Sequence, residues 1–122
     1  QLEALGVKIL NPVNSIEIAR DKLYTLQVLS SNGISIPRSL LSRVPIEYEY
    51  IESRFEYPII VKLASGSRGE TVWKCDNRHE LEELVKQIDT SKPMIIQEFI
   101  KTTKGRDLRC FGKYYIFIFF YS

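Results

Sequence analysis

The sequence has few of the residues that mark the specialised classes of protein. It contains two cysteines, one histidine, one methionine and one tryptophan among 122 residues. Cys75 and Cys110 have neither the spacing of a metal-binding motif nor the number of a disulfide framework, so we expect a reducing compartment, the cytoplasm. A net charge of +2 does not indicate a nucleic-acid-binding surface, and we expect no direct nucleic-acid binding.

Long apolar runs are also lacking. Residues 1–10 have no apolar core of a signal peptide, and the apolar run at 114–121 is far too short to cross a bilayer as a helix, so no membrane contact is expected. The run at 114–121 is typical of a strand buried on both faces, and its open edge is expected to drive self-association. Because the chain starts at Gln1 and ends on this run, we expect a fragment or truncated product.

The apolar fraction of 44% and the charged fraction of 26% are ordinary for one globular domain. Apolar residues at helical spacing predict helices at about 15–31, within 46–55 and at 77–89. Asn14 with Glu17, and Asn77 with Glu80, are capping patterns for the first and last of these, and Gly33 is predicted to follow the end of the first. Strands are predicted at 5–10, 59–63, 70–75, 94–99, 108–111 and 114–121, with a turn at Gly112-Lys113. This order predicts an α+β fold.

The most informative feature is an apolar strand that carries one lysine and leads directly into a glycine-rich loop. Lys62 lies in the strand, and Gly66, Ser67 and Gly69 follow it. Glycines let backbone N–H groups turn toward a phosphate, and a lysine supplies the countercharge. The loop is not a P-loop, because the lysine precedes the glycines. The later strand ends in Gln97-Glu98, whose polar groups suit an adenine edge, so a nucleotide between the two strands is predicted.

Each of these features has a simpler explanation. A lysine in an apolar strand can protect a sheet edge, and loops of glycine and serine commonly do no more than turn the chain. Gln97-Glu98 can be the solvated end of a strand.

The order of motifs resembles the ATP-grasp superfamily and is most similar to the RimK-like carboxylate–amine ligases. The resemblance covers nearly the whole chain, and its matching segments are residues 11–22, 33–37, 61–69, 97–100 and 105–109. It implies an ATP-grasp fold in which 1–122 is a single partial domain of antiparallel strands packed on helices. Within it, residues 15–100 would form the nucleotide-binding subdomain and 105–122 the start of the C-terminal subdomain.

The resemblance also implies a set of site residues. Lys22 and Lys62 would contact the ATP phosphates, Asp107 would accept hydrogen bonds from the ribose hydroxyls, and Arg109 would be a catalytic residue near the phosphates. In full, the implied ATP-binding set is Lys22, Lys62, Gly66, Ser67, Gly69, Gln97, Glu98, Phe99, Ile100 and Asp107, with the adenine held by backbone groups of Glu98 and Ile100. The simpler alternatives are a surface lysine at position 22 that pairs with Glu17 or Asp21, and a cross-strand ion pair between Asp107 and Arg109.

Two departures from the family pattern stand out. Thr71 occupies a position where the family usually has glycine, and Glu70 would repel a polyphosphate unless it points away or meets a cation. The family's Mg²⁺ ligands lie later than Ser122, so no metal ligand is expected within this chain, and the chain alone is expected to be inactive.

The resemblance implies the ATP-binding portion of an ADP-forming ligase. Such an enzyme activates a carboxylate as an acyl phosphate and couples it to an amine, as in glutamate ligation, with ATP and Mg²⁺ as cofactors. The carboxylate and amine substrates would be small molecules or a protein tail. A non-catalytic ATP-binding or interaction module, or a truncated product, is the first alternative, and a small-molecule kinase of the same superfamily is the second.

Overall fold

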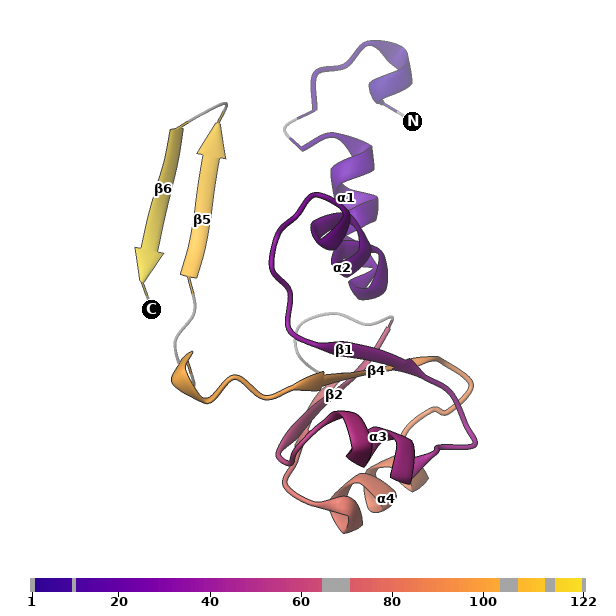
Figure 1. Ribbon diagram of the computed structural model, residues 1–122. Coiled ribbons are helices and arrows are strands. Elements are labelled where there is room, and N and C mark those ends of the chain that lie inside the picture. The colour runs from indigo at the N-terminus through magenta and orange to yellow at the C-terminus, as the bar shows by residue number, and fades with distance from the viewer. Residues whose placement is uncertain (1, 10, 65–70, 104–107, 114–115, 122) are drawn as a thin grey trace.

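A four-stranded antiparallel sheet is the centre of the computed structural model, which describes residues 2–9, 11–64, 71–103, 108–113 and 116–121. Its strands are β1 (Ser39–Ser42), β2 (Ile59–Leu63), β3 (Val72–Cys75) and β4 (Met94–Glu98), in the order β1-β4-β2-β3 (Figure 1). The predictions for β2, β3 and β4 are confirmed, although β3 begins at Val72. Strand β1 was not predicted, because its short Ser-Leu-Leu-Ser sequence carries little strand signal of its own.

The first predicted helix is divided into two. Helix α1 covers Val13–Arg20 and α2 covers Lys22–Ser31. Asp21 between them is extended, with φ −101° and ψ 112°, and its carboxylate accepts a hydrogen bond from Tyr24 N at 3.0 Å as the N-cap of α2. The prediction of one continuous helix capped by Asn14 was therefore wrong, because an aspartate can favour a new helix start over continuation of the old one. Asn14 lies inside α1, whose N-cap is Pro12.

The other sequence signals for helix ends, Gly33 and the Asn77 cap, are confirmed. Gly33 follows α2 with φ 73°, and the N–H groups of Gly33 and Ile34 donate to the carbonyls of Ser30 and Leu29, which is a Schellman ending. Helix α4 (Arg78–Gln87) begins after Asn77, whose side chain accepts from Glu80 N at 2.9 Å. Between β1 and β2 lies α3 (Tyr48–Arg54), the short helix that the sequence indicated.

The core lies on one face of the sheet. Helices α3 and α4 cover this face, whereas α1 and α2 lie on the other side of the sheet (Figure 1). The buried cluster includes Ile59, Val61 and Leu63 of β2, each at most 7% exposed. Its other buried members are Ile51, Phe55, Cys75, Leu81, Met94 and Ile96. Alternate residues of β2 are therefore committed to this core, which leaves the residues between them for the opposite face.

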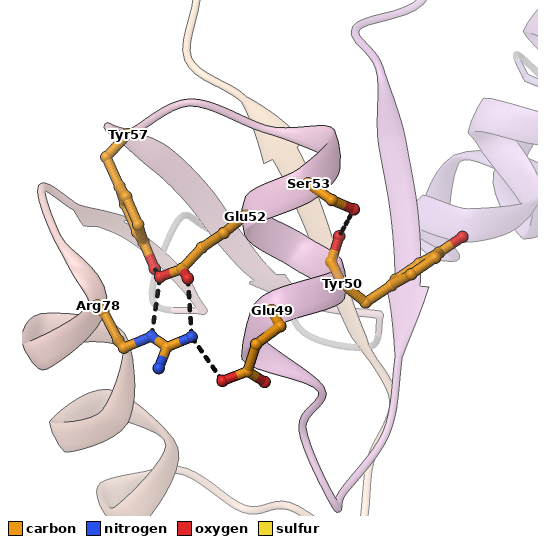
Figure 2. Close-up of polar contacts among 6 residues, drawn as sticks. All are labelled: Glu49, Tyr50, Glu52, Ser53, Tyr57 and Arg78. Carbon is orange, nitrogen blue, oxygen red and sulfur yellow. Dashed lines mark hydrogen bonds and ion pairs between the residues drawn. The ribbon is translucent and has the colours of Figure 1, made fainter.

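An ionic network joins the two core helices at the surface. Arg78 of α4 makes two hydrogen bonds to Glu52, at 2.9 and 2.7 Å, and one to Glu49 at 3.0 Å (Figure 2). Tyr57 donates to Glu52 at 3.3 Å, and burial together with the Glu52 carboxylate raises the pKa of Tyr57 to about 12. Because Arg78 is paired with both Glu49 and Glu52, we interpret this network as a link that stabilises the packing of α3 against α4, not as a ligand site.

Two predictions at the ends of the chain need correction. The predicted strand at 5–10 is wrong, because a 3-10 turn covers Glu3–Leu5 and Gly6 has a φ of 76°, which interrupts an extended chain. Strands β5 (Leu108–Lys113) and β6 (Ile116–Tyr121) form a separate two-stranded sheet. Gly112 and Lys113 pair within this ladder, so the predicted turn there is wrong, since glycine also occurs inside strands.

A second 3-10 turn covers Lys101–Thr103, after β4. Among the helices of the described residues, none is long and apolar enough to cross a membrane.

We predict that Ile96→Ala lowers the free energy of unfolding by about 2–5 kcal/mol, because Ile96 is 1% exposed in the core and its truncation leaves a cavity. Ile16→Ala removes the same atoms from a side chain that is 43% exposed, and is the matched control, with an expected change within about 0.5 kcal/mol. Urea denaturation measures both. Equal losses for the two variants would contradict the assigned core.

Candidate functional site

The face of the sheet opposite α3 and α4 carries polar residues in its central strands. Because Ile59, Val61 and Leu63 face the core, Ile60 and Lys62 point to the other side. The strand register places Lys62 opposite Ile95 and Val72, and Ile60 opposite Gln97 and Lys74.

A cavity of about 260 Å³ lies where α2 meets this face. Its lining residues are Ala19, Lys22, Thr25, Leu26, Lys62, Ile95 and Gln97. Three of them, Lys22, Lys62 and Gln97, belong to the site set that the sequence predicts, and the fold brings them together from α2, β2 and β4. Ala19 and Thr25 were not predicted as site residues, since they enter the cavity only through the placement of the two helices.

Lys62 does not protect a sheet edge. Strand β2 is an interior strand, between β4 and β3, so that alternative is wrong. The side chain is half-buried, and burial lowers the pKa of Lys62, with a further lowering from the nearby Lys22 ammonium. Two ammonium groups that repel each other at a small cavity create a positive potential there, which is a condition that favours a bound anion.

Lys22 reaches across to the end of β3. Its Nζ donates to Thr71 Oγ1 at 3.2 Å, and its backbone N–H donates to the carbonyl of Ala64 at 3.4 Å. The break at Asp21 makes Lys22 the first residue of α2, which directs it toward the sheet. The side chain is partly buried, which differs from the exposed surface lysine of the simpler alternative, and the Asp21 carboxylate accepts from Tyr24 N as the cap of the helix.

Gln97 and Glu98 have different environments. Gln97 is 3% exposed and donates from Nε2 to Ser39 Oγ at 2.7 Å, so it is not the solvated strand end of the simpler alternative. The Glu98 carboxylate accepts from Arg38 N at 2.8 Å and Arg38 Nε at 3.0 Å, and these bonds lower the pKa of Glu98. This side chain is therefore committed to Arg38, and a role of Glu98 in ligand binding would fall to its backbone, which is the role that the family resemblance implies.

The remaining predicted residues are only partly covered by the structure. Phe99 is partly buried, with Lys74 Nζ 5.5 Å from its ring centroid, and Ile100 is 46% exposed. Neither lines the cavity of Lys22 and Lys62. Arg109 lies in β5, where only its backbone is described. Four predicted residues lie outside the described residues: Gly66, Ser67, Gly69 and Asp107.

A larger groove of about 400 Å³ lies between α2 and β1. Leucine and isoleucine side chains dominate its lining, and no charged residue is among them. The smaller cavity is the better candidate, because a binding site combines an apolar surround with a few convergent polar groups and a perturbed pKa.

The described part of the chain does not form a Mg²⁺ site. Within it, no three acidic, histidine or cysteine side chains are grouped so that they could hold a metal ion. The Glu98 and Asp76 carboxylates are bound to Arg38 and Lys74, respectively. We therefore assign no chemical step to Mg²⁺ on these residues, and the position of its ligands elsewhere stays a prediction.

The fold matches solved ATP-grasp ligases. The L-amino acid ligase from Bacillus licheniformis aligns with 88% of this chain at 27% identity and a TM-score of 0.63, and this covers 23% of its own length. D-Alanine-D-alanine ligase from Helicobacter pylori aligns with 97% of the chain at a TM-score of 0.70, covering 37% of its length, and at 19% identity it shows the fold alone. The chain thus has the antiparallel α+β architecture of the ATP-grasp fold.

Sequence comparison gives the family. The model of the RimK-like ATP-grasp domain matches residues 19–112, and the chain belongs to this family. A probable alpha-L-glutamate ligase from Shewanella pealeana is 34% identical over 111 residues, which are 89% of this chain and 24% of that protein. One from Pasteurella multocida is 38% identical over 116 residues, 89% of this chain and 35% of that protein. The chain spans about a quarter to a third of the length of these relatives.

We predict that Lys62→Met raises the free energy of unfolding at pH 7, because it removes an ammonium that burial and Lys22 disfavour. The folded-state pKa is below the ordinary lysine value of 10.5, so the unfolded state binds more protons and wild-type stability rises with pH in this range. The advantage of the variant should therefore shrink as the pH rises toward 10.5.

Denaturant titrations at several pH values measure this difference. Lys92→Met, at an exposed lysine, is the control, with an expected change within about 0.5 kcal/mol at each pH. An advantage of Lys62→Met that grows with pH would refute the assigned burial of the charge.

Proposed function

We propose that this chain is the nucleotide-binding portion of an ADP-forming carboxylate–amine ligase, in which ATP binds on the face of the sheet opposite α3 and α4. The observation that carries the proposal is the cavity shared by Lys22 and Lys62. Membership of the RimK-like ATP-grasp family supports the assignment to ATP. The approach of two lysines from separate elements supports a polyanionic ligand, since lysine is a mobile point charge that suits a phosphate.

The orientation of the nucleotide follows from the direction of the strands. Lys62 lies near the end of β2 that leads into residues 65–70, so the phosphates would lie at that end. In the other direction along β2 lies Ile60, with Gln97 opposite it on β4. The adenine would therefore lie toward residues 98–100, which we call the hinge. We propose Gly66, Ser67 and Gly69 as phosphate contacts, Phe99 and the backbone of Glu98 and Ile100 as adenine contacts, and Asp107 as the ribose contact.

The proposed reaction has two steps. A carboxylate oxygen of the substrate attacks the γ-phosphorus of ATP, the bond to the bridging oxygen breaks, and ADP leaves. The amine then attacks the acyl carbon, phosphate leaves, and the amine nitrogen loses a proton. Arg109 is proposed to stabilise the acyl phosphate, and Mg²⁺ would supply charge neutralisation. The names of the relatives favour glutamate as one substrate, in free form or at a protein tail.

A non-catalytic ATP-binding module is the second candidate. Glu70 in the predicted phosphate loop favours it, because a carboxylate there opposes the charge of a polyphosphate. The two candidates share the binding site and differ in turnover. ADP formation by a longer protein that contains this chain, incubated with ATP, Mg²⁺, glutamate and acceptor amines, would favour the ligase.

We predict that Lys62→Ala weakens ATP binding by at least about tenfold, since a lost charge-assisted hydrogen bond costs about 1.5–3 kcal/mol. The control is Lys101→Ala, at an exposed lysine after the hinge, which should change the affinity less than twofold. Calorimetric titration with ATP and with adenosine measures the effect. Equal losses for Lys62→Ala and Lys101→Ala would exclude Lys62 as the phosphate contact.

We also predict that Glu70→Gly tightens ATP binding by about 1 kcal/mol, the scale of a partly screened like charge. The affinity for adenosine should stay the same, because adenosine has no phosphate to repel. The same calorimetric titration applies. An unchanged or weaker affinity for ATP would argue against a loop that closes on phosphate.

A further inference from the structure

Thr71 is the first described residue after the predicted phosphate loop, and its side chain has a defined partner. Its Oγ1 accepts the hydrogen bond from Lys22 Nζ at 3.2 Å, in a partly buried setting. The sequence singled out Thr71 only as a departure from the glycine that the family usually has there. A glycine would offer no side-chain acceptor to Lys22.

The backbone holds this hydroxyl in a fixed place. The Thr71 carbonyl accepts from Leu63 N at 3.0 Å, which extends the β2–β3 ladder beyond the pairing of Lys62 with Val72. Lys22 N–H donates to the carbonyl of Ala64, the residue that directly precedes residues 65–70 in the sequence. Lys22 is thus bonded through its backbone to the residue before this segment and through its ammonium to the residue after it.

We propose that Thr71 is a positioning residue that holds the Lys22 ammonium beside Lys62 for the phosphates of the nucleotide. The proposal rests on the proposed function of this cavity as the ATP site. An ammonium has three donors, and the bond to Thr71 uses one of them. A hydroxyl is neutral, so the bond to Thr71 itself adds no negative charge beside the lysine.

A purely structural role is the alternative. Threonine is a β-branched residue at the start of a strand, and its methyl group alone could be the reason for its presence. Thr71→Val keeps the shape and removes the hydroxyl, whereas Thr71→Ser keeps the hydroxyl. The pair therefore separates the hydrogen bond from the packing.

The deciding experiment needs no nucleotide. Titration of the lysine side chains by NMR, in the whole chain with ¹³Cε-labelled lysine, gives the pKa of Lys62 in each variant. The nearby Lys22 charge lowers this pKa, so release of Lys22 in Thr71→Val should move it upward, toward the value in Lys22→Met. Thr71→Ser should restore the wild-type pKa, and Thr71→Val should add nothing in the Lys22→Met background.

An unchanged Lys62 pKa in Thr71→Val would overturn the proposal, as would equal behaviour of the valine and serine variants. In calorimetry, Thr71→Val should weaken ATP binding about fivefold, the scale of one hydrogen bond, and leave adenosine binding unchanged. A shifted pKa with unchanged ATP affinity would overturn the link to the nucleotide. If the wild-type chain binds no ATP, the proposed function fails by itself, and the NMR titration still decides whether Thr71 positions Lys22.

Discussion

Burial of alternate residues of β2 is the constraint on which the candidate site depends. Ile59, Val61 and Leu63 are in the core under α3 and α4, so Lys62 has to point to the opposite face. A register slip of one residue would move the Lys62 ammonium into the core and Ile59, Val61 and Leu63 out of it, which would be strongly destabilising. The same packing that stabilises the domain therefore also fixes the charge at the cavity.

The charged side chains around this site differ in the groups that they contact. The Lys22 ammonium donates to the Thr71 hydroxyl, and burial and the nearby Lys22 lower the pKa of Lys62; both lysine side chains line the cavity. The Glu98 carboxylate, at the end of β4, is paired with Arg38. The placement of Lys62 beside Lys22 in a partly buried position costs some stability and favours a bound anion, which is typical of a functional site.

Local signals in the sequence predicted what is local in the structure. Strands β2 and β4 and the cap of α4 were evident from apolar runs and a short capping pattern, and Lys62 was found because it precedes the glycines. Strand β1 depends on pairing with the distant β4, and the role of Thr71 depends on a contact with Lys22 across the fold. Short-range patterns contain no record of such tertiary contacts.

Titration of the ¹⁵N-labelled chain with ATP, followed by NMR, tests most directly whether the nucleotide binds on the face of the sheet opposite α3 and α4. We predict that the amide signals that shift are those of the face opposite α3 and α4 and of α2 beside it, from Lys22, Ile60, Lys62 and Gln97. The signals of Glu52 and Leu81, on the helices that cover the other face, should stay in place. Shifts concentrated on α3 and α4, with unchanged signals from Lys22, Ile60, Lys62 and Gln97, would contradict this site.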